Sequence, residues 1–164
     1  MINARIAKTE DIEKISHLLA TSWKTAYRGI VDDDYLDSLS YDHWVNFLTT
    51  ALNGEAIFAM ALYENQEIVG ASILGKSEKE NEVHMISLYL LPDKIGKGYG
   101  HIFYSEIENE IRNRGFTKCV LDVLENNKRA IRFYESHVFT EASVGTTATL
   151  GEQIYKCKVF QKVL

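Results

Sequence analysis

Three glycines within five residues form the part of this sequence that is best suited to chemistry. The run Gly96-Lys97-Gly98-Tyr99-Gly100 lies between an apolar stretch and a segment with helical periodicity. A glycine-rich turn at the start of a helix exposes backbone N–H groups at the positive end of the helix dipole, with no Cβ atoms to keep an anion away. The run therefore indicates a site for phosphate oxygens, although a simple tight turn would also explain it.

Two common nucleotide-binding motifs do not fit this run. The dinucleotide motif of Rossmann folds requires glycine at its sixth position, where this chain has His101. The ATP-binding P-loop ends in Gly-Lys-Ser/Thr, whereas Lys97 is followed here by Gly98. The glycine run therefore belongs to neither class.

The run resembles the acetyl-CoA loop of the GNAT acetyltransferase superfamily, whose pattern is Arg/Gln-x-x-Gly-x-Gly/Ala between a strand and a long helix. Gly98 and Gly100 match the two small residues, and Ile95 departs from the pattern where the family has arginine or glutamine. The family relies mainly on main-chain amides of this loop, and Lys94 or Lys97 could replace the missing side chain. The pyrophosphate-binding residues that the resemblance implies are Ile95, Gly96, Lys97, Gly98, Tyr99, Gly100 and His101.

A second motif, NKRAIRFY, follows at residues 127–134. It resembles the family's Asn-x-x-Ala-x-x-Phe/Tyr-Tyr segment, and two motifs in the right order are more specific than one. In related enzymes the asparagine contacts pantetheine or nearby backbone and the tyrosine hydroxyl lies near the thioester sulfur, so the resemblance gives these roles to Asn127 and Tyr134. A phenol with a pKa of about 10 can protonate a departing thiolate. Without the motif, Tyr134 would be interpreted as a core aromatic, and Val138 stands where the family usually has glycine.

An attacking amine must be neutral, so a base, or a water chain that leads to one, is required. His84 is the first candidate, because it falls where several family members place a glutamate on the strand before the loop, and an imidazole titrates in a useful pH range. Glu82, two residues earlier on the same strand face, is the reserve candidate, or it could orient the histidine. The alternative for His84 is an ordinary, partly buried strand histidine.

The resemblance also implies where the rest of the two substrates lie. The strand residues Leu88, Tyr89 and Leu90 should offer backbone groups to the pantetheine, as the splayed central strands of the family do. The first helix and the loop after it would form the wall of the acceptor site. The residues expected in that wall, each with core packing or surface exposure as an equal alternative, are Trp23, Tyr27, Arg28 and Tyr35.

Composition limits the class of protein. The chain has 164 residues, of which 46% are apolar and 25% charged, which suits one domain with a packed core. A net charge of -5 disfavours non-specific binding to nucleic acid or anionic membranes and mildly favours a cationic acceptor. Cys119 and Cys157 belong to no metal or redox motif, and no apolar run reaches the length of a membrane span. We therefore expect a cytoplasmic protein that binds neither nucleic acid nor a membrane.

Hydrophobic periodicity predicts the elements that must position these residues. Helix and strand patterns alternate along the chain, and Gly115 and Pro92 are expected to end two of them. The predicted elements are a strand at 1–8, a helix at about 9–26, a second helical region after Asp32, a hairpin of strands 56–63 and 67–74, a strand at 82–91, a helix at about 101–114, a strand at 117–124, a helix at 127–137, and two strands in 139–164 that turn near Gly151.

These predictions combine into one α/β domain over residues 1–164, with a GNAT-type twisted, mostly antiparallel central sheet flanked by helices. The resemblance implies acetyl-CoA-dependent N-acetylation of a primary amine by direct attack in a ternary complex, without a metal. A small cationic amine such as a polyamine and a protein amino group both stay open as the acceptor, as does the oligomeric state, with a homodimer among the alternatives. The rival functions are a regulatory module that binds acyl-CoA without turnover and an enzyme that acts on aminoacyl-tRNA, which the lack of a basic stripe disfavours.

Overall fold

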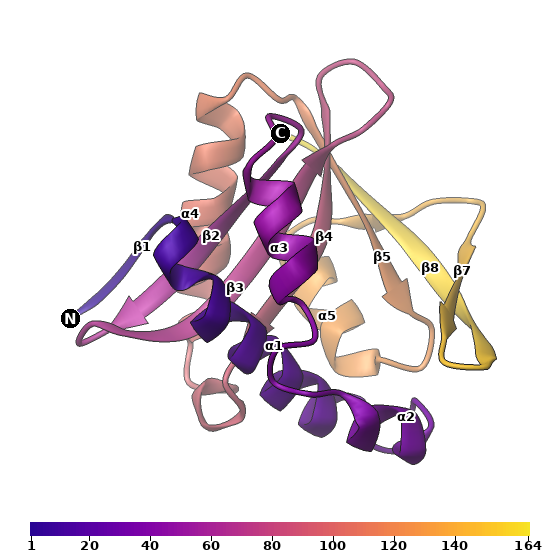
Figure 1. Ribbon diagram of the computed structural model, residues 1–164. Helices are drawn as coiled ribbons and strands as arrows, with labels where there is room; N and C mark the ends of the chain where they lie inside the picture. Colours follow the sequence, from indigo (N-terminus) through magenta and orange to yellow (C-terminus); the bar gives the residue numbers. More distant parts are fainter.

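One sheet of eight strands runs through the computed structural model, which describes all 164 residues (Figure 1). The strand order is β1-β2-β3-β4-β5-β8-β6, and β7 forms a hairpin with β8. All neighbouring strands are antiparallel except β4 and β5, which are parallel. The strands are β1 (Ile2–Ile6), β2 (Ile57–Glu64), β3 (Glu67–Lys76), β4 (Glu82–Leu90), β5 (Lys118–Leu124), β6 (Thr140–Glu141), β7 (Thr146–Leu150) and β8 (Gln153–Val163).

Helices cover both faces of this sheet. In Figure 1, α1 and α3 lie in front of the strands, α2 lies below them and α4 lies behind them. None of the helices is both long enough and apolar enough to cross a membrane. The helices are α1 (Ile12–Ala26), α2 (Asp33–Ser38), α3 (Val45–Leu52), α4 (Tyr99–Asn113) and α5 (Lys128–Ser136), with short 3-10 turns η1 (Thr9–Asp11) and η2 (Pro92–Lys94).

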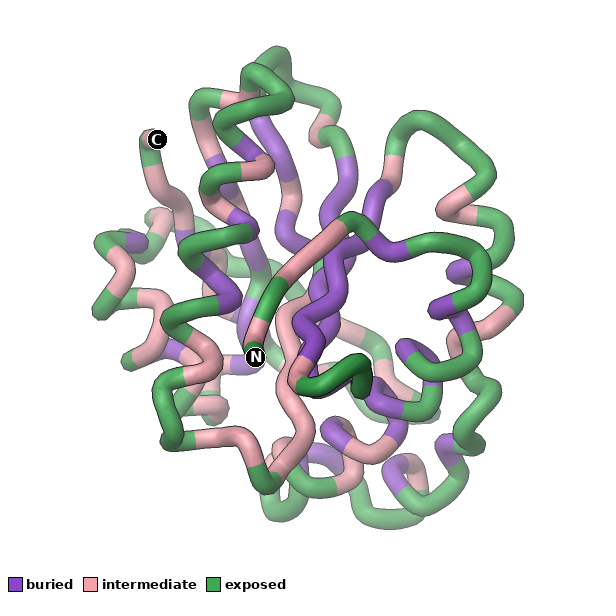
Figure 2. The backbone as a smooth tube through the Cα atoms, turned by 90° about the vertical axis from the view of Figure 1, so that its left-hand side faces the viewer, coloured by how far each residue is buried: buried purple, intermediate pink, exposed green.

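Three clusters of buried side chains hold the helices to the sheet, and the third packs Leu36 of α2 with Leu124 of β5 and Cys157 of β8. On one face, Phe103 of α4 and Ile131 of α5 pack with strand residues that include Leu74. On the other face, Ile15 of α1 and Leu48 of α3 pack with residues of β2 and β3. Buried positions (purple) are therefore continuous along the central strands in Figure 2, whereas buried and exposed positions alternate along the helices. This is the amphipathic pattern that the sequence predicts for helices that flank a sheet.

The parallel pair of strands separates soon after it begins. Backbone pairing between β4 and β5 is limited to Glu82, Val83 and His84 of β4, which face residues 118–120 of β5. The register between β3 and β4 then shifts, so that Ile86 of β4 is an extra, bulged residue. Beyond this point the two strands diverge in Figure 1. The sheet is therefore open between β4 and β5, and the candidate site lies at this opening.

The predicted fold class, a mostly antiparallel sheet flanked by helices, is confirmed. Two of the predicted elements differ in the structure. The second helical region is two helices, because the hydroxyl of Ser16 donates to the carbonyl of Tyr41 (2.8 Å) and accepts from the N–H of Trp44 (3.0 Å), which ties the connection to α1. The tail holds three strands instead of two, since residues 140–141 also pair with β8.

Helix α5 ends in a turn that is unusual for its sequence. The N–H of Val138 donates to the carbonyl of Glu135 (3.0 Å), and the N–H of Phe139 donates to the carbonyl of Tyr134 (3.1 Å), which together form a Schellman motif. Val138 stands at its left-handed position with φ = 69°, and the residue is 72% exposed. A β-branched residue is strained in this conformation, whereas the glycine of the family pattern would not be.

Replacing Val138 with glycine should therefore stabilise the protein. Relief of left-handed strain is worth roughly 1–2 kcal/mol and is partly offset by the greater freedom of glycine in the unfolded chain. We expect Val138→Gly to raise the free energy of unfolding by about 1 kcal/mol in urea denaturation. Val138→Ala keeps a Cβ atom and should give much less. Equal stability of the wild-type and glycine variants would show that this turn is unstrained.

Candidate active site

An open pocket of about 480 Å³ lies at the separation of β4 and β5. Four parts of the chain line it: α1, the end of β4, the glycine run with the start of α4, and α5. Ten of the predicted cofactor residues are in the lining, namely Leu88, Tyr89, Leu90, Ile95, Gly96, Gly98, Gly100, His101, Asn127 and Tyr134. The structure therefore brings the two sequence motifs and the predicted strand segment together in one cavity.

The glycine run leaves six consecutive backbone N–H groups without a partner in the protein. Ile95 donates to the carbonyl of Pro92 (3.3 Å), and the first amide of α4 to find an acceptor is that of Ile102, which donates to Gly98 (3.2 Å). No backbone or side-chain acceptor is bound by the amides of residues 96–101 between them. Unpaired amides at a helix start lie in the positive field of the helix and attract anions.

Glycine is required at two positions of this run for different reasons. Gly98 is the N-cap of α4 with φ = 87°, a left-handed conformation that is costly for other residues. A Cβ atom on Gly98 would meet nothing within 4 Å, which shows free space beside the amides. A Cβ atom on Gly100 would lie 3.1 Å from the Phe133 ring, so glycine there lets α4 and α5 approach closely. The two glycines therefore leave room for a ligand and set the width of the pocket.

The side chains predicted to support this loop divide into two groups. Lys94 forms an ion pair with Glu64, and the hydroxyl of Tyr99 donates to the same carboxylate, so neither is free to bind phosphate. Lys97 is exposed and does not line the pocket. Lys94 therefore does not compensate for Ile95 in this structure.

Two arginines of α5 also line the pocket, although the sequence did not predict a role for either of them. Arg129 and Arg132 are exposed and form no ion pair with the protein. They are three residues apart, which places them on neighbouring turns of one helix side. Both arginines belong to the second motif, in which they flank Ala130, but only the folded structure brings them to the pocket that the glycine run lines. The further lining residues without a predicted role are Ser22, Ala26, Ala130, Phe133 and Ser136.

Tyr134 lies where a proton donor would be useful. Its ring packs between Phe133 and Phe139, with ring centroids 5.5 and 5.7 Å away, and its hydroxyl has no hydrogen-bond partner in the protein. Burial raises the pKa of Tyr134, because the phenolate would be poorly solvated there. The hydroxyl is therefore protonated at neutral pH and free to donate into the pocket.

Two more tyrosine hydroxyls form a pair at this opening. The hydroxyls of Tyr27, the C-cap residue of α1, and Tyr89 in β4 are 2.6 Å apart. Burial raises the pKa of both groups, and the Tyr27–Tyr89 bond holds α1 against the separated end of β4. The predicted wall residue Tyr27 therefore does lie at the junction of the pocket with the α1 side of the sheet.

Asn127 contacts nearby backbone, which is one of the two roles that the family resemblance implies for it. Its side-chain oxygen accepts from the N–H of Ala130 (3.3 Å) and caps the start of α5. Asn127 also lines the pocket, and its side-chain amide nitrogen has no partner in the protein. This residue therefore fixes the helix that carries Tyr134, and it leaves a donor at the cavity.

The two candidate bases have different surroundings. Glu82 is buried, accepts from the Ser77 hydroxyl (2.8 Å) and pairs with Lys118 (3.4 Å). Burial alone would raise the pKa of Glu82, but these two partners outweigh it and lower the pKa. The carboxylate does not bond to His84, so the prediction that it orients the histidine is wrong in this structure. No group of three or more His, Cys, Asp or Glu side chains here could hold a metal ion.

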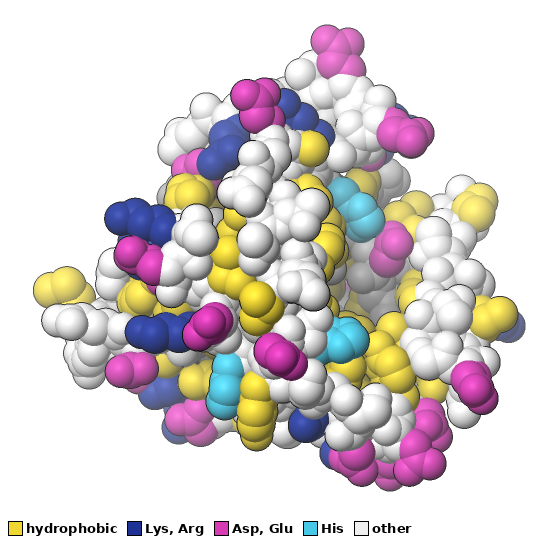
Figure 3. Space-filling model, viewed as in Figure 1, with side chains coloured by type: hydrophobic (Ala, Val, Ile, Leu, Met, Phe, Trp, Pro, Cys, Tyr) yellow, Lys and Arg dark blue, Asp and Glu magenta, His cyan; other side chains and the backbone are white.

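His84 remains available on the α1 side of the sheet. It pairs with Gly75 of β3 and Val120 of β5 through the backbone, is half-buried, and its ring forms no hydrogen bond. It does not line the cofactor pocket. In Figure 3 a histidine (cyan) and an acidic side chain (magenta) flank a hollow between α3 and the β7–β8 hairpin. An acceptor could reach the opening from this hollow.

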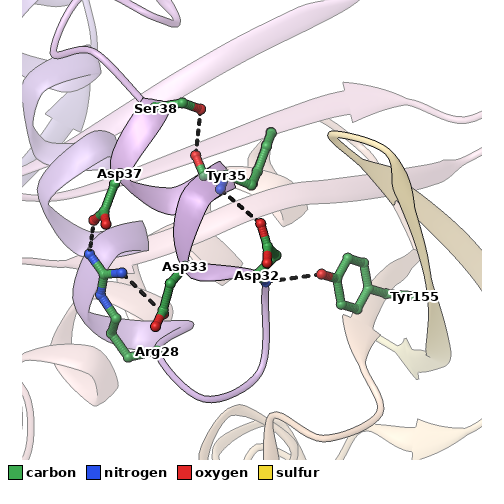
Figure 4. A network of polar contacts seen from close by, with 7 residues as sticks. All are labelled: Arg28, Asp32, Asp33, Tyr35, Asp37, Ser38 and Tyr155. Carbon is green, nitrogen blue, oxygen red and sulfur yellow. Dashed lines mark hydrogen bonds and ion pairs between the residues drawn. The ribbon is translucent and has the colours of Figure 1, made fainter.

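The remaining residues that were predicted for the acceptor wall, namely Arg28, Trp23 and Tyr35, make contacts within the protein. Arg28 forms ion pairs with Asp33 (3.1 Å) and Asp37, both on α2 (Figure 4). The hydroxyl of Tyr155 on β8 accepts from the N–H of Asp32 (3.0 Å), which joins the start of α2 to the β7–β8 hairpin. Arg28 therefore orders α2 and is not a free cation for substrate. Trp23 packs edge-on against Tyr27, and Tyr35 packs against the hairpin tip at Gly151.

Comparison with known proteins gives one family and several relatives. The model of the acetyltransferase (GNAT) family matches residues 13–139. The chain is 28% identical over 141 residues to the uncharacterized N-acetyltransferase YuaI of Bacillus subtilis strain 168, covering 84% of this chain and 79% of that protein. It is 24% identical over 160 residues to the spermidine N(1)-acetyltransferase of Thermoplasma acidophilum, covering 94% and 98%.

A solved structure shares the whole fold. The PaiA N-acetyltransferase of Thermoplasma acidophilum, determined in complex with coenzyme A, superposes with a TM-score of 0.81 at 22% identity. The superposition covers 100% of this chain and 99% of that one. The match therefore extends beyond the two motifs to all strands and helices.

A negative charge at Gly98 should disrupt binding at the six amides. We expect Gly98→Asp to raise the dissociation constant of acetyl-CoA by at least about tenfold, roughly 1.4 kcal/mol, because the carboxylate would occupy the anion site. Gly98→Asn is the matched control, since asparagine has the same shape, tolerates a left-handed conformation and carries no charge. Calorimetric titration of both variants checks this. Equal constants for the two variants would mean that charge at this turn does not matter.

Proposed function

Because the chain belongs to the GNAT family of acetyltransferases, we propose that it acetylates a primary amine of a small cationic compound such as a polyamine. The chain is an acetyl-CoA-dependent N-acetyltransferase, and the acceptor is the part that we propose. The observation that carries this function is the pocket, which is lined by Tyr134, whose hydroxyl has no partner, and by four of the six residues with unpaired amides, namely Gly96, Gly98, Gly100 and His101. The relationship to a spermidine N(1)-acetyltransferase and the net charge of -5 support a cationic acceptor.

The residues of the pocket fit coenzyme A in charge and in shape. The amides of residues 96–101 would bind the pyrophosphate, and Arg129 and Arg132 would bind further phosphate oxygens. Residues 88–90 would contact the pantetheine, because β4 has no neighbouring strand on its β5 side beyond His84. When bound, acetyl-CoA supplies a thioester whose acetyl carbon an amine can attack.

Tyr134 would act as the general acid. Its hydroxyl stays protonated at neutral pH because burial raises its pKa, and it lines the pocket without a competing acceptor. It would donate its proton to the sulfur as the thiolate leaves. The low-dielectric surroundings make the phenolate costly in the resting state, so the proton leaves only when the sulfur develops charge.

His84 would take the proton from the attacking amine, directly or through water. It is the candidate base without a competing partner, whereas Glu82 is held by Ser77 and Lys118. The position of His84 on the α1 side of the sheet fits an acceptor that enters from the hollow of Figure 3. The reaction then needs no covalent enzyme intermediate, because both substrates meet at the opening.

We further propose that residues 1–164 act as one domain in the cytoplasm. The strands of the sheet extend from residue 2 to residue 163, so segments from both ends of the sequence belong to the same sheet. Both cysteines are free thiols, as is common in the cytoplasm. A regulatory module that holds acyl-CoA without turnover is the second candidate, and the availability of Tyr134 and His84 favours the enzyme.

Removing the Tyr134 hydroxyl should slow chemistry without weakening cofactor binding. We expect Tyr134→Phe to lower kcat by about 100-fold, because the thiolate would leave unprotonated, while the dissociation constant of acetyl-CoA stays the same. Thiol release is measured with a panel of polyamines, amino acid amides and peptide α-amines. Turnover equal to wild type would remove Tyr134 from the acid role, and no thiol release by the wild type with any amine would favour the regulatory module.

Removing the His84 ring tests its role as the base separately. We expect His84→Ala to lower kcat/KM, because the ring that has no partner in the protein would no longer be there to accept the proton of the attacking amine. His43→Ala, an exposed histidine on the loop before α3, is the matched control and should match the wild type. An unchanged kcat/KM in the His84 variant would assign the proton to solvent or another group.

A further inference from the structure

Asp122 lies in the middle of β5 on the side of the sheet from which the acceptor would enter. Its neighbours Leu121 and Val123 point into the core cluster beneath α4 and α5. Side chains alternate along a strand, so Asp122 and Leu124 point to the opposite side. Leu124 confirms this, since it packs with Tyr27 of α1. Asp122 is therefore on the α1 side of the sheet, and it is exposed.

The carboxylate of Asp122 is not neutralised by the protein. It takes part in no ion pair or hydrogen bond. The residue opposite Asp122 on β8 is Val159. Two lysines of the same strand, Lys158 and Lys162, form ion pairs with Glu141 and Glu108, respectively. Because no cationic side chain pairs with it, the Asp122 carboxylate is available to an incoming cation.

The opening beside Asp122 also contains unpaired polar groups from β4. Asp122 lies two residues beyond Val120, which is the last residue of β5 that pairs with β4. Across this gap, the hydroxyl oxygen of Ser87 is buried without a hydrogen-bond partner, and the ring of His84 has none either. Ser87 faces Ile73, which packs against α1, so it lies on the same side of the sheet as Asp122. The half-buried ring of His84 is accessible to a polar ligand, whereas the Ser87 hydroxyl is covered by the protein.

We propose that Asp122 binds a second cationic nitrogen of the acceptor, so that the enzyme selects diamines and polyamines over monoamines. This inference rests on the proposed function and adds the residue that sets its specificity. Asp122 is not among the residues that line the Tyr134 pocket, so its carboxylate lies away from the point of acetyl transfer. The nitrogen that reacts must lose its proton, whereas a second ammonium group keeps its charge throughout the reaction.

A carboxylate that holds this second nitrogen stabilises the bound substrate and the transition state equally. Such uniform binding changes KM and leaves kcat unchanged. A residue that only maintains the structure would change both amine classes alike. The difference between a diamine and the monoamine of the same chain length is therefore the signature of Asp122.

The test compares putrescine with butylamine in the wild type, in Asp122→Asn and in Glu106→Gln. Asparagine keeps the shape of aspartate, and Glu106 is an exposed residue of α4 on the opposite side of the sheet, where the same change of charge is a matched control. We expect Asp122→Asn to raise KM for putrescine by about tenfold, roughly 1.4 kcal/mol, with kcat unchanged and with butylamine unaffected. Glu106→Gln should match the wild type with both amines.

Equal changes for putrescine and butylamine, or no change for either, would overturn the assignment of Asp122 while leaving the acetyltransferase function intact. Calorimetry keeps the inference testable without turnover. Spermidine should bind the CoA-loaded wild type and the CoA-loaded Glu106→Gln variant, and bind Asp122→Asn about tenfold more weakly. Equal spermidine binding by all three proteins contradicts the proposal. If no amine is acetylated by the wild type, the proposed function fails, and the calorimetric comparison still decides the role of Asp122.

Discussion

The separation of β4 from β5 is the constraint on which the rest of this structure depends. The two strands share three residue pairs and then part, with a bulge at Ile86 and a glycine-bearing turn after Pro92. If β4 and β5 were paired along their whole length, this region would be continuous sheet. Instead the separated strands leave a pocket lined by α1, the end of β4, the start of α4 and α5. In the proposed reaction the cofactor occupies this pocket, and the acceptor enters from the α1 side of the sheet, where His84 lies.

The start of α4 provides unpaired N–H groups, which carry partial positive charge, beside this gap. Every helix leaves its first amides unpaired, and side-chain caps or water usually satisfy them. Here the N-cap is Gly98, which has no side chain to serve as a cap, so the amides stay unpaired. Arg129 and Arg132 of α5 line the same pocket as the glycine run. A diphosphate would satisfy both groups at once, and this explains why polar groups remain unpaired in an otherwise well-bonded fold.

Part of this site could be predicted from the sequence. The glycine run was found from its own residues, whereas Asn127 and Tyr134 were singled out by the family resemblance of residues 127–134, and the structure places all of them at one pocket. The partners of Glu82 could not be predicted, because Ser77 and Lys118 reach it through strand pairing between distant segments. Alternation along β4 placed Glu82 and His84 on one face, and the bulge at Ile86 lies beyond both residues. Asp122 had no local signal at all, since its importance comes from the absence of a neighbouring strand.

Backbone amide signals of residues 96–101 give the most direct test of the account. In a titration followed by 15N–1H correlation spectroscopy, coenzyme A should shift these six signals more than those of any other segment. Pantetheine, which lacks the pyrophosphate, should instead shift signals of β4 and leave the six nearly in place. Coenzyme A that binds with the amide signals of residues 96–101 unmoved would contradict the central claim that unpaired main-chain N–H groups hold the diphosphate.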